Sequence, residues 1–132
     1  IVVLAVIVAA FVYCTAATAA VRPVCLTGPV FTATAYGPPW GGINGGGVTA
    51  SGVGLGIARG GGYRRVYGVA VDPRVIPLGS SRRIWPNPFG YRGRFRAFDT
   101  GGAIKGNRID FYDWRGRSHQ YGWGRRTVRV CR

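Results

Sequence analysis

The chain has 132 residues and a mass of 14.1 kDa, which allows one domain, since a second would be too small to bury its own core. It carries 18 lysine and arginine residues against 4 acidic residues, a formal net charge of +14, and its 47% hydrophobic content excludes a charged disordered tail. The 23 glycines and 8 prolines indicate many turns and argue against a helical bundle. Glutamate is absent, so any carboxylate that acts as an acid or a base must be Asp72, Asp99, Asp110 or Asp113.

The N-terminal segment is apolar. Residues 1–21 contain no charge, and Arg22 is the first charged side chain. The stretch Ile1–Val12 has the length of a signal-peptide core, and the small residues after it resemble a cleavage site. About 20 apolar residues also suffice to span a bilayer, so an uncleaved anchor is the alternative. We expect residues 1–21 to be a signal peptide or membrane anchor, and residues 22–132 to be one extracytoplasmic domain, secreted or membrane-anchored.

The signal peptide also bears on how the cysteines pair. Cleavage of the signal would remove Cys14 and leave Cys25 and Cys131 near the two ends of the mature domain. An even pair of cysteines in an oxidising compartment predicts a disulfide, with two free buried thiols as the alternative. The cysteines and His119 have neither CxxC nor HxxxH spacing, so the sequence offers no zinc site. We expect neither a metal ion nor another cofactor.

Short segments with the composition of β-strands follow along the chain, separated by glycine and proline. Several alternate apolar with polar residues, as half-buried strands do, and one alternates arginine with aromatic or small residues. The predicted strands are Val30–Tyr36, Val66–Val71, Arg82–Trp85, Tyr91–Phe98, Arg108–Tyr112 and Thr127–Cys131. Only Ser118–Trp123 hints at a helical turn. Such a series of short strands predicts an all-β barrel or sandwich.

Between the first two predicted strands lies the glycine-rich, irregular stretch Pro38–Gly62. We interpret it either as a surface loop or as a wall of a site. Its Gly52-Val-Gly-Leu-Gly run has neither the GxGxxG spacing nor the strand-to-helix context of a dinucleotide site.

Two carboxylates bracket a glycine-rich turn in the segment Asp99-Thr-Gly-Gly-Ala-Ile-Lys-Gly-Asn-Arg-Ile-Asp110. Asp99 ends one predicted strand and Asp110 lies inside the next, so a turn between adjacent strands would bring both to one rim of a barrel. Asp72 ends a third strand. Acids so placed are candidates for acid–base catalysis, because burial or a neighbouring carboxylate raises a pKa into the useful range. The alternative is that each aspartate caps a turn or pairs with an arginine.

A series of segments covers the chain from about residue 30 to residue 131. They are Phe31–Tyr36 (FTATAY), Val48–Gly52 (VTASG), Val69–Gly79 (VAVDPRVIPLG), Asp99–Tyr112 (DTGGAIKGNRIDFY) and Gly124–Val130 (GRRTVRV). In this order they resemble the three-aspartate or 3D domain of bacterial cell-wall proteins, among them stationary-phase survival proteins. That domain is similar to the catalytic domain of membrane-bound lytic transglycosylase A. The resemblance implies an all-β fold, a six-stranded double-psi β-barrel, which acts on peptidoglycan.

The resemblance also implies roles for the three aspartates. Asp110 matches the catalytic acid of the transglycosylase. Asp99 matches the aspartate that opens the Gly-Gly turn, and we interpret it as the partner that tunes and orients the acid. Asp72 matches a third acid, with a structural or supporting role.

Other residues are candidates for substrate binding. Thr34 and Tyr36 fall on a strand that lines the groove in the family, while Gly101, Gly102 and Lys105 belong to the motif turn. Lys105 either contacts carboxylates of the substrate or faces water. The tryptophans that could stack on sugar rings, with packing as the alternative, are Trp40, Trp85 and Trp114.

The implied activity is that of a peptidoglycan-cleaving lytic transglycosylase, with Asp110 as acid and then base at the bond between N-acetylmuramic acid and N-acetylglucosamine. The alternatives are a non-catalytic module that binds wall polysaccharide and a glycoside hydrolase with Asp99 as the second carboxylate. Expected partners are peptidoglycan glycan strands and other anionic wall polymers, bound by a monomer or by part of a larger assembly. The charge of +14 also suits nucleic acid, but export and the wall motif argue against that role.

Overall fold

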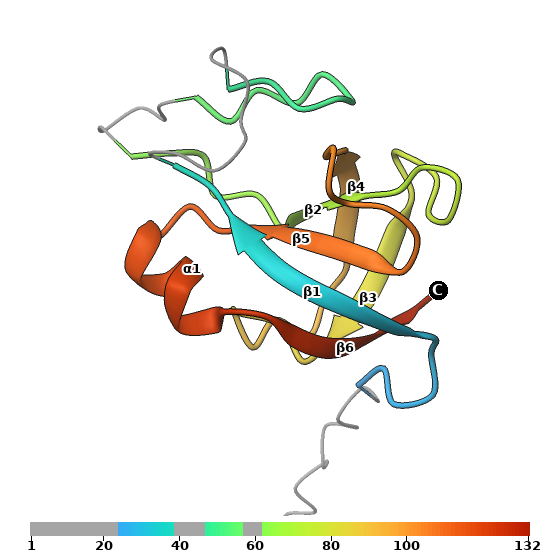
Figure 1. The fold of residues 1–132 in the computed structure, drawn as a ribbon. Helices are drawn as coiled ribbons and strands as arrows, with labels where there is room; N and C mark the ends of the chain where they lie inside the picture. The colour runs from blue at the N-terminus through green and yellow to red at the C-terminus, as the bar shows by residue number, and fades with distance from the viewer. Residues whose placement is uncertain (1–23, 39–46, 57–61) are drawn as a thin grey trace, which may run out of the picture.

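A computed structural model describes residues 24–38, 47–56 and 62–132 of the chain (Figure 1). The described residues form six strands and one short helix. The strands are β1 (Val30–Tyr36), β2 (Gly68–Val71), β3 (Ser81–Trp85), β4 (Phe95–Asp99), β5 (Arg108–Tyr112) and β6 (Arg126–Cys131), and the helix is α1 (Arg117–Trp123). All six predicted strands are therefore confirmed, as is the helical turn near the end of the chain.

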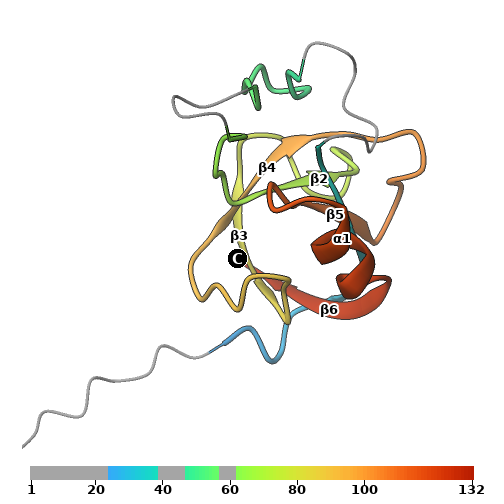
Figure 2. The ribbon, with the colours of Figure 1, turned by 90° about the vertical axis from the view of Figure 1, so that its left-hand side faces the viewer.

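The strands close into a barrel in the order β1-β5-β2-β4-β3-β6. Figure 2 looks at the barrel from the side of α1. Two neighbouring pairs are parallel, β1 with β5 and β2 with β4, and the other four are antiparallel. Strands distant in sequence therefore lie side by side, as in a double-psi β-barrel. The all-β fold class and the six-stranded barrel expected from the sequence are confirmed.

The interior of the barrel is filled by apolar side chains from every strand, because alternate residues of a strand point to one face. Each fully buried Val, Leu, Ile or Phe side chain contributes roughly 1.5–3 kcal/mol to folding. These interior residues are Phe31, Ala33, Val69, Val71, Ile76, Ile84, Phe95, Ala97, Ile109, Phe111, Trp123, Val128 and Val130.

A second, smaller apolar cluster lies on the outer face of the barrel, beside the ends of β1 and β5. Its strand residues alternate with the interior ones, and it is covered by side chains from the loops. It contains Tyr36, Leu55, Ala70, Phe98, Ile104 and Tyr112. Segment 47–56, which carries Leu55, lies over this end of the barrel (Figure 1). The segment is fastened by the Ser51 amide and hydroxyl, which both donate to the carbonyl of Phe98.

Two predicted strands begin later than expected, because β2 starts at Gly68 instead of Val66 and β4 starts well after Tyr91. The prediction of a strand from Tyr91 was wrong for its first four residues, because the structure begins β4 at Phe95. The cause is the side chain of Asn87, which organises a turn. Its amide donates to the carbonyls of Ile84 and Tyr91, at 2.9 and 2.8 Å, and its oxygen accepts from the Tyr91 amide at 2.9 Å. Tyr91 is thereby held in the turn.

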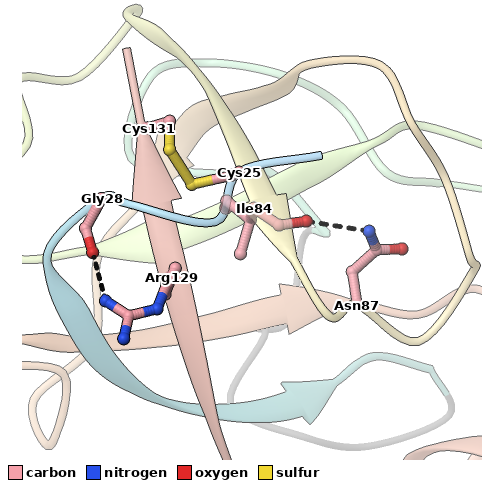
Figure 3. Close-up of a disulfide and its surroundings, with 6 residues drawn as sticks. All are labelled: Cys25, Gly28, Ile84, Asn87, Arg129 and Cys131. Carbon is pink, nitrogen blue, oxygen red and sulfur yellow. Dashed lines mark hydrogen bonds between the residues drawn. A yellow bond between two sulfur atoms is a disulfide. The ribbon is translucent and has the colours of Figure 1, made fainter. Parts of the chain in front are cut away.

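The expected disulfide is present between Cys25 and Cys131, whose Cα atoms lie 5.6 Å apart (Figure 3). It joins the segment that leads into β1 to the end of β6. The expected signal peptide or anchor, residues 1–21, lies outside the described residues, as do Trp40 and parts of Pro38–Gly62. Within the described ranges, no helix has the length and apolar character needed to cross a membrane.

Candidate functional site

The two carboxylates of the motif lie in one row across neighbouring strands. Asp110 on β5 pairs with Thr34 on β1 and, on its other side, with Ala70 on β2. Ala70 in turn pairs with Asp99 on β4. The two acids therefore lie on strands that are separated by β2, and the small side chain of Ala70 lies between them. Neighbouring strands are ~4.8 Å apart, so the strands that carry the acids are about twice that distance apart.

This geometry corrects one expectation. The spacing of Asp99 and Asp110 predicted a turn between adjacent strands, but β4 and β5 are not neighbours, because β2 lies between them. The acids nevertheless share the outer face of the barrel, since Ile109 and Phe111 on either side of Asp110 point into the interior.

Asp110 is a half-buried carboxyl that accepts a hydrogen bond from Thr34. The Thr34 hydroxyl donates a 2.7 Å hydrogen bond to its Oδ1. Burial raises the pKa of Asp110 to about 6, and the charge of Asp99 adds to that rise, while the Thr34 hydrogen bond and the charge of Arg108 oppose it. A carboxyl with such a pKa can both give and take a proton near neutral pH, as an acid–base catalyst must.

Asp99 has a different environment, because donors occupy both of its oxygens. The Tyr36 hydroxyl donates to Oδ2 at 2.8 Å, and the amides of Ala50 and Thr100 donate to Oδ1, each at 2.9 Å. Burial, followed by the charge of Asp99, raises the pKa of Tyr36 far above its ordinary value, so its hydroxyl keeps its proton and remains a donor. Asp99 is thus a carboxyl group held in place by three hydrogen bonds beside Asp110.

Asp72 stands apart from this row. Its side chain is 2% exposed and accepts two hydrogen bonds from the guanidinium of Arg74, at 3.0 and 2.7 Å. It also accepts a 2.8 Å bond from the amide of Gly106, which has a φ of 61°, a conformation that favours glycine. The hydrogen bonds from Arg74 hold the pKa of Asp72 well below its ordinary range. Asp72 therefore fastens the motif turn to the end of β2.

The fourth acid, Asp113, is fully buried and forms an ion pair with Arg115 at 2.7 Å, so it does not join the row. Of the two tryptophans that the structure describes among the proposed sugar stackers, Trp114 is stacked on Phe89 with ring centroids 4.6 Å apart. It packs within the fold. Trp85 lies on the opposite side of the barrel from Asp110, because β3 and β5 are three strands apart in either direction.

The remaining candidates lie in the turn after β4. The carbonyl of Gly101 accepts a 3.1 Å hydrogen bond from Ile104, whose side chain enters the outer cluster under Tyr36. Gly102 and Lys105 are exposed. The structure therefore brings Thr34 and Tyr36 into contact with the acids. Gly101 belongs to the turn that follows Asp99, and Lys105 is exposed at the edge of that turn.

Two contributors were missed as site residues by sequence reasoning. Ala50 donates its amide to Asp99, and Ala70 separates the two acids. Ala50 belongs to Val48–Gly52, one of the segments that resemble the 3D domain, and this resemblance could have marked it as a site residue. Nothing in the sequence marked Ala70, because its position depends on strand order.

A hollow of about 500 Å³ in the described structure does not contain the row of Asp99 and Asp110. It lies at the end of the barrel where β1 begins, and is lined by Phe31, Ile76 and Arg82 among others. The row stands out by its chemistry instead. Across the described ranges, no three His, Cys, Asp or Glu side chains gather as a group that could hold a metal ion.

Comparison with known proteins gives three results. Residues 67–132, half of the chain, match the profile of the 3D domain. The cell wall-binding protein YocH of Bacillus subtilis (strain 168) is 46% identical over 99 residues, which are 75% of this chain and 30% of YocH. YabE of the same organism, named for a role in cell wall shaping, is 47% identical over 62 residues, 47% of this chain and 14% of YabE. The chain thus spans less than a third of these relatives.

Among solved structures, the chain is similar to the lytic transglycosylase LtgG of Burkholderia pseudomallei, with 31% sequence identity and a TM-score of 0.45. The similarity covers 63% of this chain and 25% of LtgG.

Proposed function

Because the chain belongs to the 3D domain family, we propose that it cleaves the glycan strands of peptidoglycan as a lytic transglycosylase, with Asp110 as the catalytic residue. One observation carries the proposal. Asp110 is half-buried, has a pKa raised to about 6, and lies beside the fixed carboxylate of Asp99. The wall as the place of action is supported by the names of YocH and YabE.

The reaction uses one carboxyl twice. Protonated Asp110 gives its proton to the glycosidic oxygen between N-acetylmuramic acid and N-acetylglucosamine, and the bond from the muramoyl anomeric carbon to that oxygen breaks. The carboxylate then takes the proton of the muramoyl 6-hydroxyl, whose oxygen bonds to the anomeric carbon. The product is a 1,6-anhydro sugar, and Asp110 is protonated again. The charge of Asp99 favours the protonated starting state, because it raises the pKa of Asp110.

Hydrolysis would require a second carboxylate as nucleophile or as base for water. Asp99 is the available group, but its oxygens accept hydrogen bonds from Tyr36, Ala50 and Thr100. A carboxylate held by these donors is a weaker nucleophile, which favours cyclisation over hydrolysis.

The second candidate is a module that binds the wall without cutting it. The name of YocH, a cell wall-binding protein, favours this function. In either case the partner is the glycan strand, and the domain acts outside the cytoplasm, exported by residues 1–21 as a signal peptide or anchor.

Digestion of purified sacculi, followed by mass spectrometry of the soluble products, tests the proposal. We expect products with 1,6-anhydro ends from the wild type and none from Asp110→Asn, while both proteins bind the sacculi and melt cooperatively. Reducing ends would identify a hydrolase, and binding without soluble products would identify the binding module. Full activity of Asp110→Asn would overturn the assignment of the acid.

A further inference from the structure

The outer face of β3 and β6 carries a second cluster of functional side chains. Ile84, Val128 and Val130 point into the barrel, so the alternate residues of the same strands point outward. Trp85 on β3 pairs directly with Arg129 on β6, and Arg83 lies two residues from Trp85 on the same face. We call Arg83, Trp85 and Arg129 the Trp85 face.

The Trp85 face has both an apolar and a charged component. A hollow of about 260 Å³ runs along Trp85 and Arg129, and its walls include Leu26 and Val30. Leu26 is 68% exposed and Val30 47% exposed, so apolar surface is available beside the indole ring. The guanidinium carbon of Arg92 lies 5.9 Å from the Trp85 ring centre, which adds a third positive charge. The neighbourhood of Arg129 and the disulfide is shown in Figure 3.

Arg83 and Arg129 have no carboxylate partner among the described residues. The chain has 4 acidic side chains, and all of them lie elsewhere. Asp72 and Asp113 pair with Arg74 and Arg115. Asp110 lies on the far side of the barrel, and the oxygens of Asp99, at the end of β4, accept hydrogen bonds from Tyr36, Ala50 and Thr100. Within the described ranges, no ion pair joins Arg83 or Arg129 to a carboxylate, although Arg129 donates to the carbonyl of Gly28.

We propose that the Trp85 face binds an acidic polysaccharide, with a sugar ring packed on the indole of Trp85 and its carboxylate or phosphate groups bound by Arg83 and Arg129. The C–H face of a sugar suits an aromatic plane bordered by aliphatic side chains. Guanidinium groups bind carboxylate and phosphate with paired, charge-assisted hydrogen bonds. The site uses neither Asp99 nor Asp110, so it goes beyond the proposed cleavage and does not depend on it.

A single-stranded nucleic acid is the competing polyanion, because bases also stack on tryptophan. Such platforms use successive aromatic rings. Tyr91 lines a small hollow together with Arg83 and Trp85, but its ring is already stacked on that of Tyr67, with centroids 3.8 Å apart. The hollow beside Trp85 is bordered by the aliphatic side chains of Leu26 and Val30, with no second aromatic ring among its described lining residues, and this favours the sugar.

Fluorescence anisotropy with the full chain tests the proposal. The labelled probes are an oligogalacturonate, a phosphomannan oligosaccharide, a neutral dextran oligosaccharide and a short oligothymidylate. We expect the acidic sugars to bind and the neutral one not to bind, and the first two probes to decide between carboxylate and phosphate. Arg83→Gln and Arg129→Gln should each weaken binding by roughly fivefold, and Trp85→Ala should weaken it by roughly tenfold. The affinity of Trp85→Phe should lie between those of Trp85→Ala and the wild type.

The matched control is Arg117→Gln, which removes the same charge from α1, and it should bind like the wild type. Asp110→Asn should also bind like the wild type, whatever the outcome of the cleavage assay. Thermal melts show that each variant is folded. The proposal is overturned if Arg117→Gln weakens binding as much as Arg83→Gln does. It is also overturned by the absence of binding, by equal binding of the neutral sugar, or by Trp85-dependent binding of oligothymidylate that is tighter than that of the acidic sugars.

Discussion

The hydroxyl of Thr34 donates a 2.7 Å hydrogen bond to the carboxylate of Asp110, across the parallel pairing of β1 and β5. This bond stabilises the ionised form of Asp110 and so opposes the effect of burial on its pKa. In Thr34→Val, we expect the pKa of Asp110 to rise above its value of about 6, by roughly one unit. The alkaline limb of the cleavage profile should move to higher pH by the same amount, because the proposed reaction begins with protonated Asp110.

Carbon-13 NMR titration of the Asp110 carboxyl measures this shift without an activity assay. The control is Thr32→Val, which alters the same face of β1 two residues earlier. An unchanged titration in Thr34→Val would show that the hydrogen bond does not tune the acid.

The raised pKa of Asp110 also affects stability. Because the folded-state pKa is about 6 and the ordinary value is 3.8, ionised Asp110 is less favourable in the folded protein, and its contribution destabilises the fold as pH rises from 4 through 6. Asp110→Asn removes this cost. At pH 8 the variant should be more stable than the wild type by about 2–3 kcal/mol, and the gap should close toward pH 4.

Urea unfolding of both proteins at the two pH values measures the difference. Equal free energies of unfolding at pH 8 would contradict the prediction, because they would mean that burial imposes no cost on the carboxylate.

Ionised Asp72 affects stability in the opposite direction from Asp110, because it stabilises the folded protein. Arg74 lowers its pKa, so its contribution to stability is present above the ordinary pKa of an aspartate, ~4, and is lost as pH falls below it. Asp72→Asn should lower the melting temperature at pH 7 by several degrees, and the difference from the wild type should shrink in acid. Below its melting temperature the variant should still cut the wall, since Asp72 is not in the row of Asp110.

Differential scanning calorimetry and the sacculus assay give the two readouts. Arg74→Gln is the companion variant and should reproduce part of the loss in melting temperature. A folded Asp72→Asn protein without cleavage activity would contradict the structural role.

The disulfide between Cys25 and Cys131 closes a loop with a sequence separation of 106 residues. In the chain-entropy model, opening a loop of this length costs about 4–5 kcal/mol of stability. The double variant Cys25→Ser, Cys131→Ser should lose this amount in urea unfolding, and a reductant should have no further effect on it. A wild type whose stability is the same with and without reductant would show that the bond does not constrain the unfolded chain.

Much of the fold was predictable because strand alternation is local. Val30–Tyr36 and Arg108–Tyr112 were predicted with the bounds that the structure has. The start of β4 was not, because the side chain of Asn87 captures Tyr91 in a turn, and a side-chain hydrogen bond does not appear in an alternation pattern.

The site was only partly predictable, for a different reason. The motif named Asp99 and Asp110, but their separation by β2 and the placement of Ala70 between them depend on strand order, which is not a local property. The contact between Asp99 and the amide of Ala50 likewise joins residues 49 positions apart.

The disulfide has a mechanical consequence. It lies at the base of the barrel, where the chain enters β1 and leaves β6. Tension applied to segments attached before Cys25 and after Cys131 passes from one sulfur to the other and bypasses all six strands. Under load, the hydrogen bonds that align Thr34, Asp110 and Asp99 therefore lie outside the path of the force, and the row keeps its geometry.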